Sequence, residues 1–211
     1  MQKEKQVLGF YDYTVILTYI SLLISVGGIF LAICGYLKLS VTALALSGLC
    51  DMFDGKIART KKNRTIDEQR FGVQIDSLCD MVCFGISPAI ICFQMGMNRP
   101  TGIIILMIFV LTGLIRLAFY NVMTENPEEC PEGECSVYHG LPITSSAIAL
   151  PLVMILHPLL RLNFIFVLQI VMLSIAVLYV TNFRLKKPTN AVLAIMVIIV
   201  GLAVLKLLHL C

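Results

Sequence analysis

The sequence predicts an all-α integral membrane protein, a polytopic helical bundle with about six to eight transmembrane helices. Of the 211 residues 58% are hydrophobic and 14% are charged, whereas a soluble domain averages about 25% charged residues. The mean hydropathy is +0.90, and several apolar runs approach or exceed the ~20 residues that cross a bilayer. These runs do not alternate between polar and apolar positions, which favours helices over a barrel.

Seven candidate spans follow one another, separated by short polar turns or basic links. They cover about 15–37, 41 to the aspartates at 51 and 54, 71–96, 102–122, 142–160, 164–181 and 191–210. Gly27 and Gly28 in the first span would let a second helix approach closely. Since no fixed-period repeat or polar second domain interrupts the pattern, residues 1–211 are interpreted as one membrane-embedded domain.

The placement of positive charge predicts the orientation, because basic residues gather on the cytoplasmic side of membrane proteins. A cytoplasmic amino terminus puts the larger basic group on that side: Lys3, Lys5, the link 60–70, Arg184, Lys186 and Lys187. The opposite side receives Lys38, Arg99 and Arg161, and Lys206 is a further candidate for that side. We therefore expect a multi-pass protein of the cell membrane, with the acidic loop 124–138 at its cytoplasmic face.

Four carboxylates mark the stretch from 51 to 80, at Asp51, Asp54, Asp76 and Asp80. The first pair is spaced i, i+3 and the second i, i+4, so on helices each pair projects from one face. Unneutralised carboxylates at a membrane boundary are costly. Mg²⁺ and Mn²⁺ prefer carboxylate oxygens and leave positions open for substrate phosphates. The pattern predicts a site for divalent cations near the cytoplasmic surface.

Smaller residues and one arginine surround these acids. Gly55, Ala58 and Gly72 would let a bulky group approach the helix backbone. Arg59 offers a planar fork of donors suited to phosphate. Together they suggest a substrate that contains a diphosphate. The alternative is a set of polar residues that satisfy one another inside the bundle.

Eight of these positions form one spaced pattern, Asp51-x2-Asp54-Gly55-x2-Ala58-Arg59 followed by Gly72-x3-Asp76-x3-Asp80. The pattern resembles the signature of the CDP-alcohol phosphotransferases, with a twelve-residue gap between Arg59 and Gly72 that is long for the family. The sequence segments FDGKIAR, FGVQIDSLCD and YHGLPIT are similar to segments of the serine-using branch of this family, the phosphatidylserine synthases. The resemblance covers about 11–160.

The resemblance implies a reaction and a role for each residue of the pattern. A phosphatidyl group would pass from CDP-diacylglycerol to the hydroxyl of L-serine, giving phosphatidylserine and CMP. Two divalent ions, Mg²⁺ or Mn²⁺, would be held by the four aspartates, with Asp80 also the general base. Gly55, Ala58 and Gly72 would make room for the nucleotide, and Arg59 would contact phosphate. The resemblance further implies a homodimer among membrane lipids, and no nucleic-acid partner is expected.

The acceptor pocket is predicted from residues farther along the chain. Arg116 should face the bundle interior or water, where it would pair with a serine carboxylate or, alternatively, form a structural pair with an aspartate. The other candidates are Tyr120, Asn121, Tyr138, Gly140 and Pro142. His139 is an alternative base to Asp80.

Other functions remain open from sequence. The same chemistry would serve another acceptor, such as glycerol 3-phosphate or inositol phosphate, or an archaeal-type ether-lipid donor. A cation transporter would also place acids in a helical bundle, although nearer the bilayer midplane. Cys130 and Cys135 form a C-x4-C pair, which is a poor zinc signal without a second pair nearby.

Overall fold

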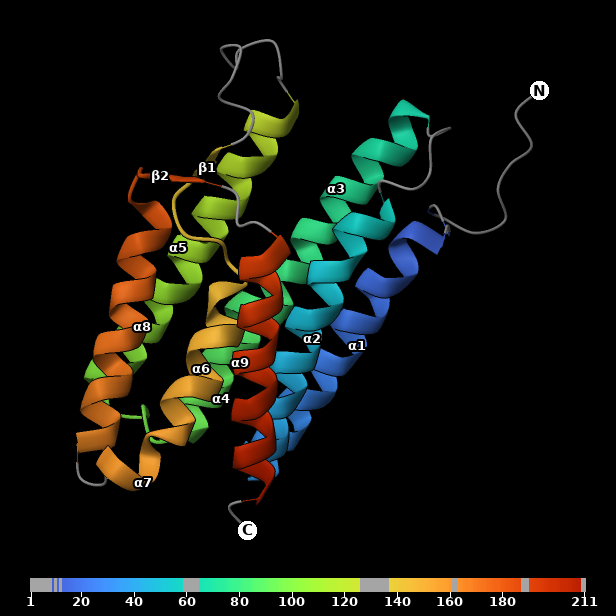
Figure 1. Ribbon diagram of the computed structural model, residues 1–211. Helices are drawn as coiled ribbons and strands as arrows, with labels where there is room; N and C mark the ends of the chain where they lie inside the picture. Colours follow the sequence, from blue (N-terminus) through green and yellow to red (C-terminus); the bar gives the residue numbers. More distant parts are fainter. Residues whose placement is uncertain are drawn as a thin grey trace.

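Figure 1 shows helices that run back and forth along one common direction, with the short strands and the amino terminus at one end. The structure, a computed structural model, describes residues 9, 11, 13–58, 65–125, 137–160, 163–186 and 190–209. In chain order the described elements are α1 (Tyr13–Ile33), α2 (Leu37–Ala58), α3 (Ile66–Asp80), the π-helix η1 (Met81–Ile86), α4 (Ser87–Gln94), α5 (Pro100–Glu125), β1 (Val137–His139), α6 (Ser145–Ile155), α7 (His157–Leu160), α8 (Phe164–Val180), β2 (Arg184–Lys186) and α9 (Asn190–His209). The predicted all-α bundle is confirmed.

Three described stretches are long and apolar enough to cross a membrane, namely Val15–Ile33, Ile66–Gln94 and Pro100–Met123. Shorter apolar helical stretches cover Ser145–Ile155, Phe164–Val180 and Val197–Lys206. Each predicted span therefore corresponds to helical structure, with α2 as the helix that carries Asp51 and Asp54. The number of helices that cross the membrane stays a prediction.

The α1–α2 pair packs closely because small residues meet between the two helices near the turn that joins them. A Cβ atom added at Gly28 would lie 2.9 Å from the Cβ of Ala43. Nearby, the Ser40 hydroxyl donates to the Gly28 carbonyl at 2.7 Å. The close approach predicted for Gly28 is confirmed, whereas a Cβ at Gly27 would meet nothing within 4 Å.

The predicted third span is not one regular helix. After Asp80 the chain widens into η1, where the Ser87 N–H donates to the Val82 carbonyl five residues earlier. The Ser146 hydroxyl of α6 donates to the Phe84 carbonyl at 3.0 Å within this segment. Because π turns are rare and are frequent at functional sites, the irregularity directly after Asp80 draws attention to that end of the bundle.

The bundle has a closely packed interior and an apolar exterior. Phe84 and Phe109 are completely buried, and a Cβ added at Gly48 would lie 2.9 Å from the Cβ of Ala147, so α2 and α6 are nearly in backbone contact. On the outside, Leu23 is 72% exposed. Such a surface is unfavourable in water and is expected where lipid replaces water.

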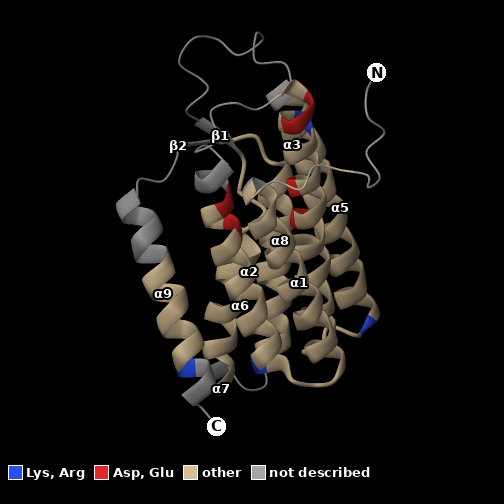
Figure 2. Ribbon diagram, turned by 90° about the vertical axis from the view of Figure 1, so that its right-hand side faces the viewer, with Lys and Arg blue, Asp and Glu red and all other residues tan. Residues whose placement is uncertain are grey.

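Charge is distributed unevenly along the bundle, as Figure 2 shows. The acidic residues of the described elements gather toward the end where β1 and β2 lie, together with the mixed charges at the start of α3. Basic segments mark the opposite end. In the sequence Lys38 is the second residue of α2, Arg99 directly precedes α5 and Lys206 lies near the end of α9. The carboxylates of the predicted site therefore lie toward one end of the bundle, as the sequence predicted, and not at its middle.

Candidate active site

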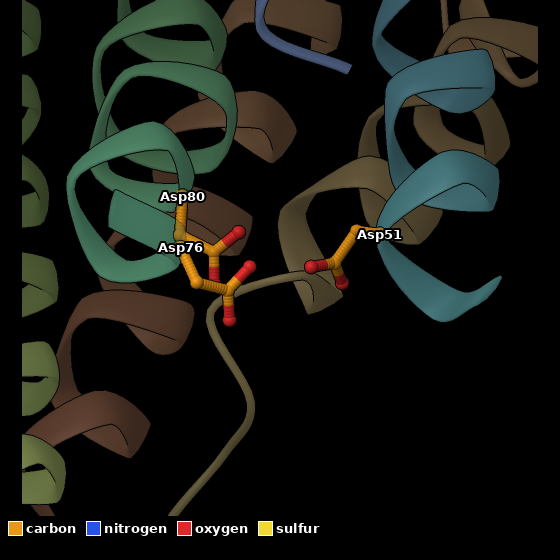
Figure 3. Close-up of side chains that lie close together, drawn as sticks. All are labelled: Asp51, Asp76 and Asp80. Carbon is orange, nitrogen blue, oxygen red and sulfur yellow. The ribbon is translucent and has the colours of Figure 1, made fainter. Parts of the chain in front are cut away.

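Three aspartates from two helices face one another near that end. Asp51 comes from α2, while Asp76 and Asp80 come from α3, one helical turn apart. One carboxylate oxygen from each residue lies within 4.8 Å of the other two. Figure 3 shows the three side chains pointing into the space between the two helices. All three are partly buried, so their charges are only partly solvated.

The helix that carries Asp76 and Asp80, α3, has a defined start. Thr65 is the N-cap, and its side chain accepts from the Glu68 N–H at 3.2 Å. In return the Glu68 carboxylate accepts from the Thr65 N–H at 3.0 Å. This capping box satisfies two backbone donors at the helix start. Because residues i and i+4 share one face of a helix, Asp76 and Asp80 lie on the same side of α3, and the packing of α3 against α2 turns that side toward Asp51.

Asp54 takes a different direction from the other three. It lies on α2 three residues after Asp51 and is 6% exposed. Its Oδ2 accepts a hydrogen bond from the Thr18 hydroxyl of α1 at 3.1 Å. The structure thus groups three of the four predicted metal ligands within 4.8 Å and holds the fourth against α1.

The donor set of this site fits a divalent cation. All three grouped ligand atoms are carboxylate oxygens, the donors that Mg²⁺ and Mn²⁺ prefer. Mg²⁺ is commonly bound through one or two protein carboxylates together with substrate phosphates and water. Three carboxylates on two adjoining helices can therefore hold metal and still leave coordination positions for a substrate.

The residues predicted to receive the nucleotide follow Asp54 or precede Asp76. Gly55 and Ala58 fall in the last turn of α2, and Gly72 lies in α3 one turn before Asp76. Gly72 is partly buried. Arg59 lies outside the described residues, as do Cys130 and Cys135. The roles assigned to these residues stay predictions.

The acceptor candidates Arg116 and Gly140 meet at one turn. Arg116 of α5 is 8% exposed, and its Nε donates to the Leu141 carbonyl. Gly140 has a φ of +75°, a left-handed conformation that favours glycine, and its N–H donates to the Phe183 carbonyl at 2.9 Å. Arg116 thus has a structural contact in this turn. From the sequence, its predicted partner was either the acceptor carboxylate or an aspartate.

The same turn is held from α8. The Leu141 N–H donates to the Leu178 carbonyl at 3.3 Å, and the Tyr179 hydroxyl donates to the Ile143 carbonyl at 2.9 Å. Just before it, β1 pairs antiparallel with β2, so that Tyr138 lies opposite Leu185 and His139 opposite Arg184. Pro142 follows in the turn, and its carbonyl accepts from the Ser145 N–H at 3.1 Å.

Two further acceptor candidates lie on the last turns of α5. The Asn121 side-chain oxygen accepts from the Ser77 hydroxyl of α3 at 2.7 Å, which places Asn121 beside the residue that follows Asp76. Tyr120 is 44% exposed. Of this pair, Asn121 is the one that the structure connects to the aspartate-bearing helix.

Sequence reasoning missed the partners that hold these groups: Thr18, Ser77 and Tyr179. One signal was available. Thr18 and Ser21 stand three residues apart in an otherwise apolar span, a spacing that puts both on one helix face. Nothing comparable marks Ser77 or Tyr179, whose contacts lie 44 and 36 residues away in the sequence.

Comparison with known proteins finds several relatives. The chain is 37% identical over 103 residues to a CDP-diacylglycerol–serine O-phosphatidyltransferase of Saccharomyces cerevisiae, covering 48% of this chain and 36% of that protein. It is 30% identical over 151 residues to an archaetidylserine synthase of Methanothermobacter thermautotrophicus, covering 71% and 60%. A Helicobacter pylori CDP-diacylglycerol–serine O-phosphatidyltransferase is 33% identical over 120 residues, covering 56% and 45%. The matched region thus spans between about a third and three fifths of these relatives.

A family profile covers more of the chain than any of these three pairwise matches. The profile described as CDP-alcohol phosphatidyltransferase matches residues 14–181, which include α1 through α8, the three grouped aspartates and the turn at Leu141. The resemblance predicted from the eight-position pattern is confirmed. With this match over most of its length, and with three of the four signature aspartates brought together between α2 and α3, the chain belongs to the CDP-alcohol phosphatidyltransferase family.

Proposed function

We propose that this protein transfers a phosphatidyl group from CDP-diacylglycerol to the hydroxyl of L-serine, giving phosphatidylserine and CMP. The observation that carries the proposal is the grouping of Asp51, Asp76 and Asp80 in a chain of this family. Serine is favoured as the acceptor because relatives from yeast and Helicobacter pylori carry the name of that reaction.

The chemistry suits an interfacial carboxylate site. The serine oxygen attacks the phosphorus that carries the diacylglycerol, a new P–O bond forms, and the bond to the CMP oxygen breaks. Asp80 accepts the proton that the serine hydroxyl loses. When bound, two Mg²⁺ or Mn²⁺ ions offset the negative charge on the diphosphate oxygens. Asp51, Asp54 and Asp76 complete the ligand set in this proposal.

The nucleotide would approach the carboxylates along the junction of α2 and α3. Gly55, Ala58 and Gly72 carry little or no side chain, which leaves room for a cytidine beside the helices. Arg59 follows directly and would donate to a phosphate oxygen. This assignment rests on the family signature.

The acceptor would enter from the side of α5 and the turn at Leu141. Arg116 is buried at this turn, and a guanidinium in a buried position is suited to a carboxylate. Asn121 lies beside the aspartate-bearing helix through Ser77. The proposal assigns these two residues, with Tyr120, Tyr138, Gly140 and Pro142, to the serine pocket.

The position of the site relative to the membrane suits a lipid substrate. The grouped aspartates lie toward one end of an apolar bundle, where a lipid headgroup meets water while its acyl chains remain in the bilayer. We place this end at the cytoplasmic face of the cell membrane, on the positive-charge pattern of the sequence. A homodimer is proposed on the family resemblance.

An ether-lipid donor is the second candidate. It is favoured by the archaetidylserine synthase relative, whose match covers 71% of this chain. Both donors present the same diphosphate to the aspartates and differ in the lipid that lies in the bilayer. The two versions therefore share one site and one acceptor.

The test follows CMP release from purified full-length protein in detergent with Mg²⁺ or Mn²⁺. CDP-diacylglycerol and an ether-lipid CDP donor are supplied separately, each with L-serine, glycerol 3-phosphate or inositol phosphate. The proposal expects release with CDP-diacylglycerol and serine and its loss with chelator. Release with another acceptor would discard the serine pocket while retaining the aspartate site. If no combination of donor and acceptor releases CMP and the protein does not bind CMP in the presence of metal, the proposed transferase function is wrong. Cation transport is then the function to test.

A further inference from the structure

The face of α1 that meets α2 and η1 carries hydroxyl side chains. Thr18, Ser21 and Ser25 follow one another at i, i+3 and i+7, a spacing that aligns them on one side of a helix. They are 5%, 3% and 0% exposed. In a span that is otherwise apolar, this row is the polar seam of α1, and its members have no place in the signature of the family described above.

Thr18 uses its hydroxyl differently from three other threonines of the described part of the chain. Thr42 and Thr112 donate to carbonyls of their own helices, those of Lys38 and Phe109, and Thr181, the C-cap of α8, donates to the Val177 carbonyl of that helix. Such local bonds are available to a threonine in or next to a helix. Thr18 donates instead to Oδ2 of Asp54, on another helix and 36 residues away.

The direction of this bond is well defined by its surroundings. A threonine side chain in a helix has few χ1 rotamers, and both partners are buried, with Thr18 at 5% and Asp54 at 6% exposed. Hydrogen bonds to a carboxylate are stronger than those between neutral groups. The Thr18 hydroxyl therefore restrains the orientation of the Asp54 carboxylate, not only its position.

One turn farther along α1, Ser21 joins the two segments that carry the site. Its hydroxyl donates to the Ser47 carbonyl of α2 at 3.1 Å and lies 2.8 Å from the Ser47 hydroxyl. The same oxygen lies 3.9 Å from Cys83 Sγ in η1, three residues after Asp80. The seam thus contacts α2 ahead of Asp54 and η1 just beyond Asp80.

We propose that Thr18 is a positioning residue of the active site: its hydroxyl orients Asp54 for metal and diphosphate binding. Through this bond α1 takes part in the site although it contributes no ligand of its own. The inference rests on the proposed function, in which Asp54 is a metal ligand. It explains why Asp54 turns toward α1 while the three other aspartates face one another.

The test compares Thr18→Val, which removes the hydroxyl at nearly constant shape, with Thr18→Ser, which keeps it. Purified full-length protein in detergent is titrated with Mn²⁺ alone, and free Mn²⁺ is measured by electron paramagnetic resonance. Thr18→Val should weaken Mn²⁺ binding by about 10- to 100-fold, the usual effect of losing a partner that orients a ligand. Thr18→Ser should stay close to the unaltered protein. Thr42→Val removes a hydroxyl that bonds only within its own helix and should leave Mn²⁺ binding unchanged.

A double-mutant cycle separates positioning from general loss of packing. If Thr18 acts through Asp54, Thr18→Val should add no further loss of Mn²⁺ affinity to Asp54→Asn, because coupled residues are non-additive. Full additivity, or a Thr18→Ser variant as weak as Thr18→Val, would overturn the proposal. If the Thr18→Val protein is too unstable to purify in folded form, Thr18→Ala is compared with Thr18→Ser in its place.

The Mn²⁺ measurement is independent of the reaction. Should the unaltered protein release no CMP with any donor and acceptor, the proposed function fails, while the Thr18 variants still report on Mn²⁺ binding at Asp54. Should CMP release occur and Thr18→Val bind Mn²⁺ as well as the unaltered protein, the transferase stands and Thr18 has a packing role only.

Discussion

The carboxylate half of the site and the half around Leu141 are assembled in different ways. Asp51, Asp76 and Asp80 come from α2 and α3, two helices that follow one another in the chain. The turn at Leu141 depends on Arg116 of α5, on the end of α8 and on the β1–β2 pair. The first half is encoded by helix periodicity over 30 residues, 51–80, and the second by contacts across the whole fold.

This difference suggests that the carboxylate half carries out the chemistry and that the half around Leu141 selects the acceptor. The group of acids depends on few segments, because i, i+4 spacing aligns Asp76 and Asp80 on one face of α3 and one helix pair then brings them to Asp51. A turn held by several distant segments is sensitive to substitution, because a shift of any one of these segments displaces the turn. The hydrogen bond between Ser77 and Asn121 is one connection between the two halves. The predictions below address each half in turn, from the largest expected effect to the smallest.

Asp80→Asn should affect chemistry more than binding. Removing the proposed base should lower CMP release by about 10²- to 10⁴-fold, the usual contribution of general acid–base catalysis, while Mn²⁺-dependent CMP binding is largely retained. Asp67→Asn is the matched control, since Asp67 is exposed in the first turn of α3, and its activity should be unchanged. Unaltered turnover in Asp80→Asn would show that the base lies elsewhere.

Arg116→Ala tests the other half. If Arg116 binds the acceptor carboxylate, the KM for serine should rise by about 10- to 100-fold, as expected for a lost hydrogen bond to a charged group, with little change for CDP-diacylglycerol. Arg116→Lys keeps the charge and loses the Nε donor to Leu141, so rescue by lysine would assign the effect to charge. Arg99→Ala, directly before the start of α5, is the control. A change confined to the donor would place Arg116 in the diphosphate site.

Gly140→Ala should damage the turn without touching the aspartates. Its φ of +75° disfavours a side chain, and an added Cβ would lie 3.2 Å from the Thr181 carbonyl oxygen. We expect a loss of about 1–2 kcal/mol of stability, measured by thermal unfolding in detergent, together with a higher KM for serine. Gly27→Ala, where a Cβ meets nothing within 4 Å, should be neutral or stabilising. Equal melting temperatures for both variants would contradict this account of Gly140.

Ser77→Ala should produce the smallest change. It removes the donor to Asn121, and a net hydrogen bond of this kind corresponds to about a 2- to 10-fold effect. If the Ser77–Asn121 pair orients the acceptor, the KM for serine should rise while Mn²⁺ binding is unaffected. A parallel weakening of Mn²⁺ binding would instead indicate that Ser77 supports Asp76 next to it.

Much of the carboxylate half was predictable. The eight-position pattern identified the family and named four aspartates, three of which the structure brings together. Gly28 was expected to allow a close helix approach and does so against Ala43. These features depend on spacing within single helices, and helix periodicity converts such spacing directly into geometry. The long apolar runs were equally direct, since bilayer thickness sets their length.

Other features required the fold. The π turn after Asp80 leaves the apolar pattern of the span unchanged, and its support by Ser146 comes from α6. The sequence grouped Asp54 with the other aspartates, and its bond to Thr18 appears only when α1 lies beside α2. Arg116 and Leu141 are 25 residues apart, too far for any local rule to pair them.

By itself the sequence determined that this chain is a membrane bundle of the CDP-alcohol phosphatidyltransferase family with its acids on α2 and α3. Composition, run length and short-range spacing suffice for this, because they act within one helix at a time. Only the tertiary structure decided which aspartates face one another, which hydroxyl orients Asp54 and what holds the turn at Leu141. Those outcomes depend on how separate helices pack and rotate against one another, and packing is a property of pairs of segments.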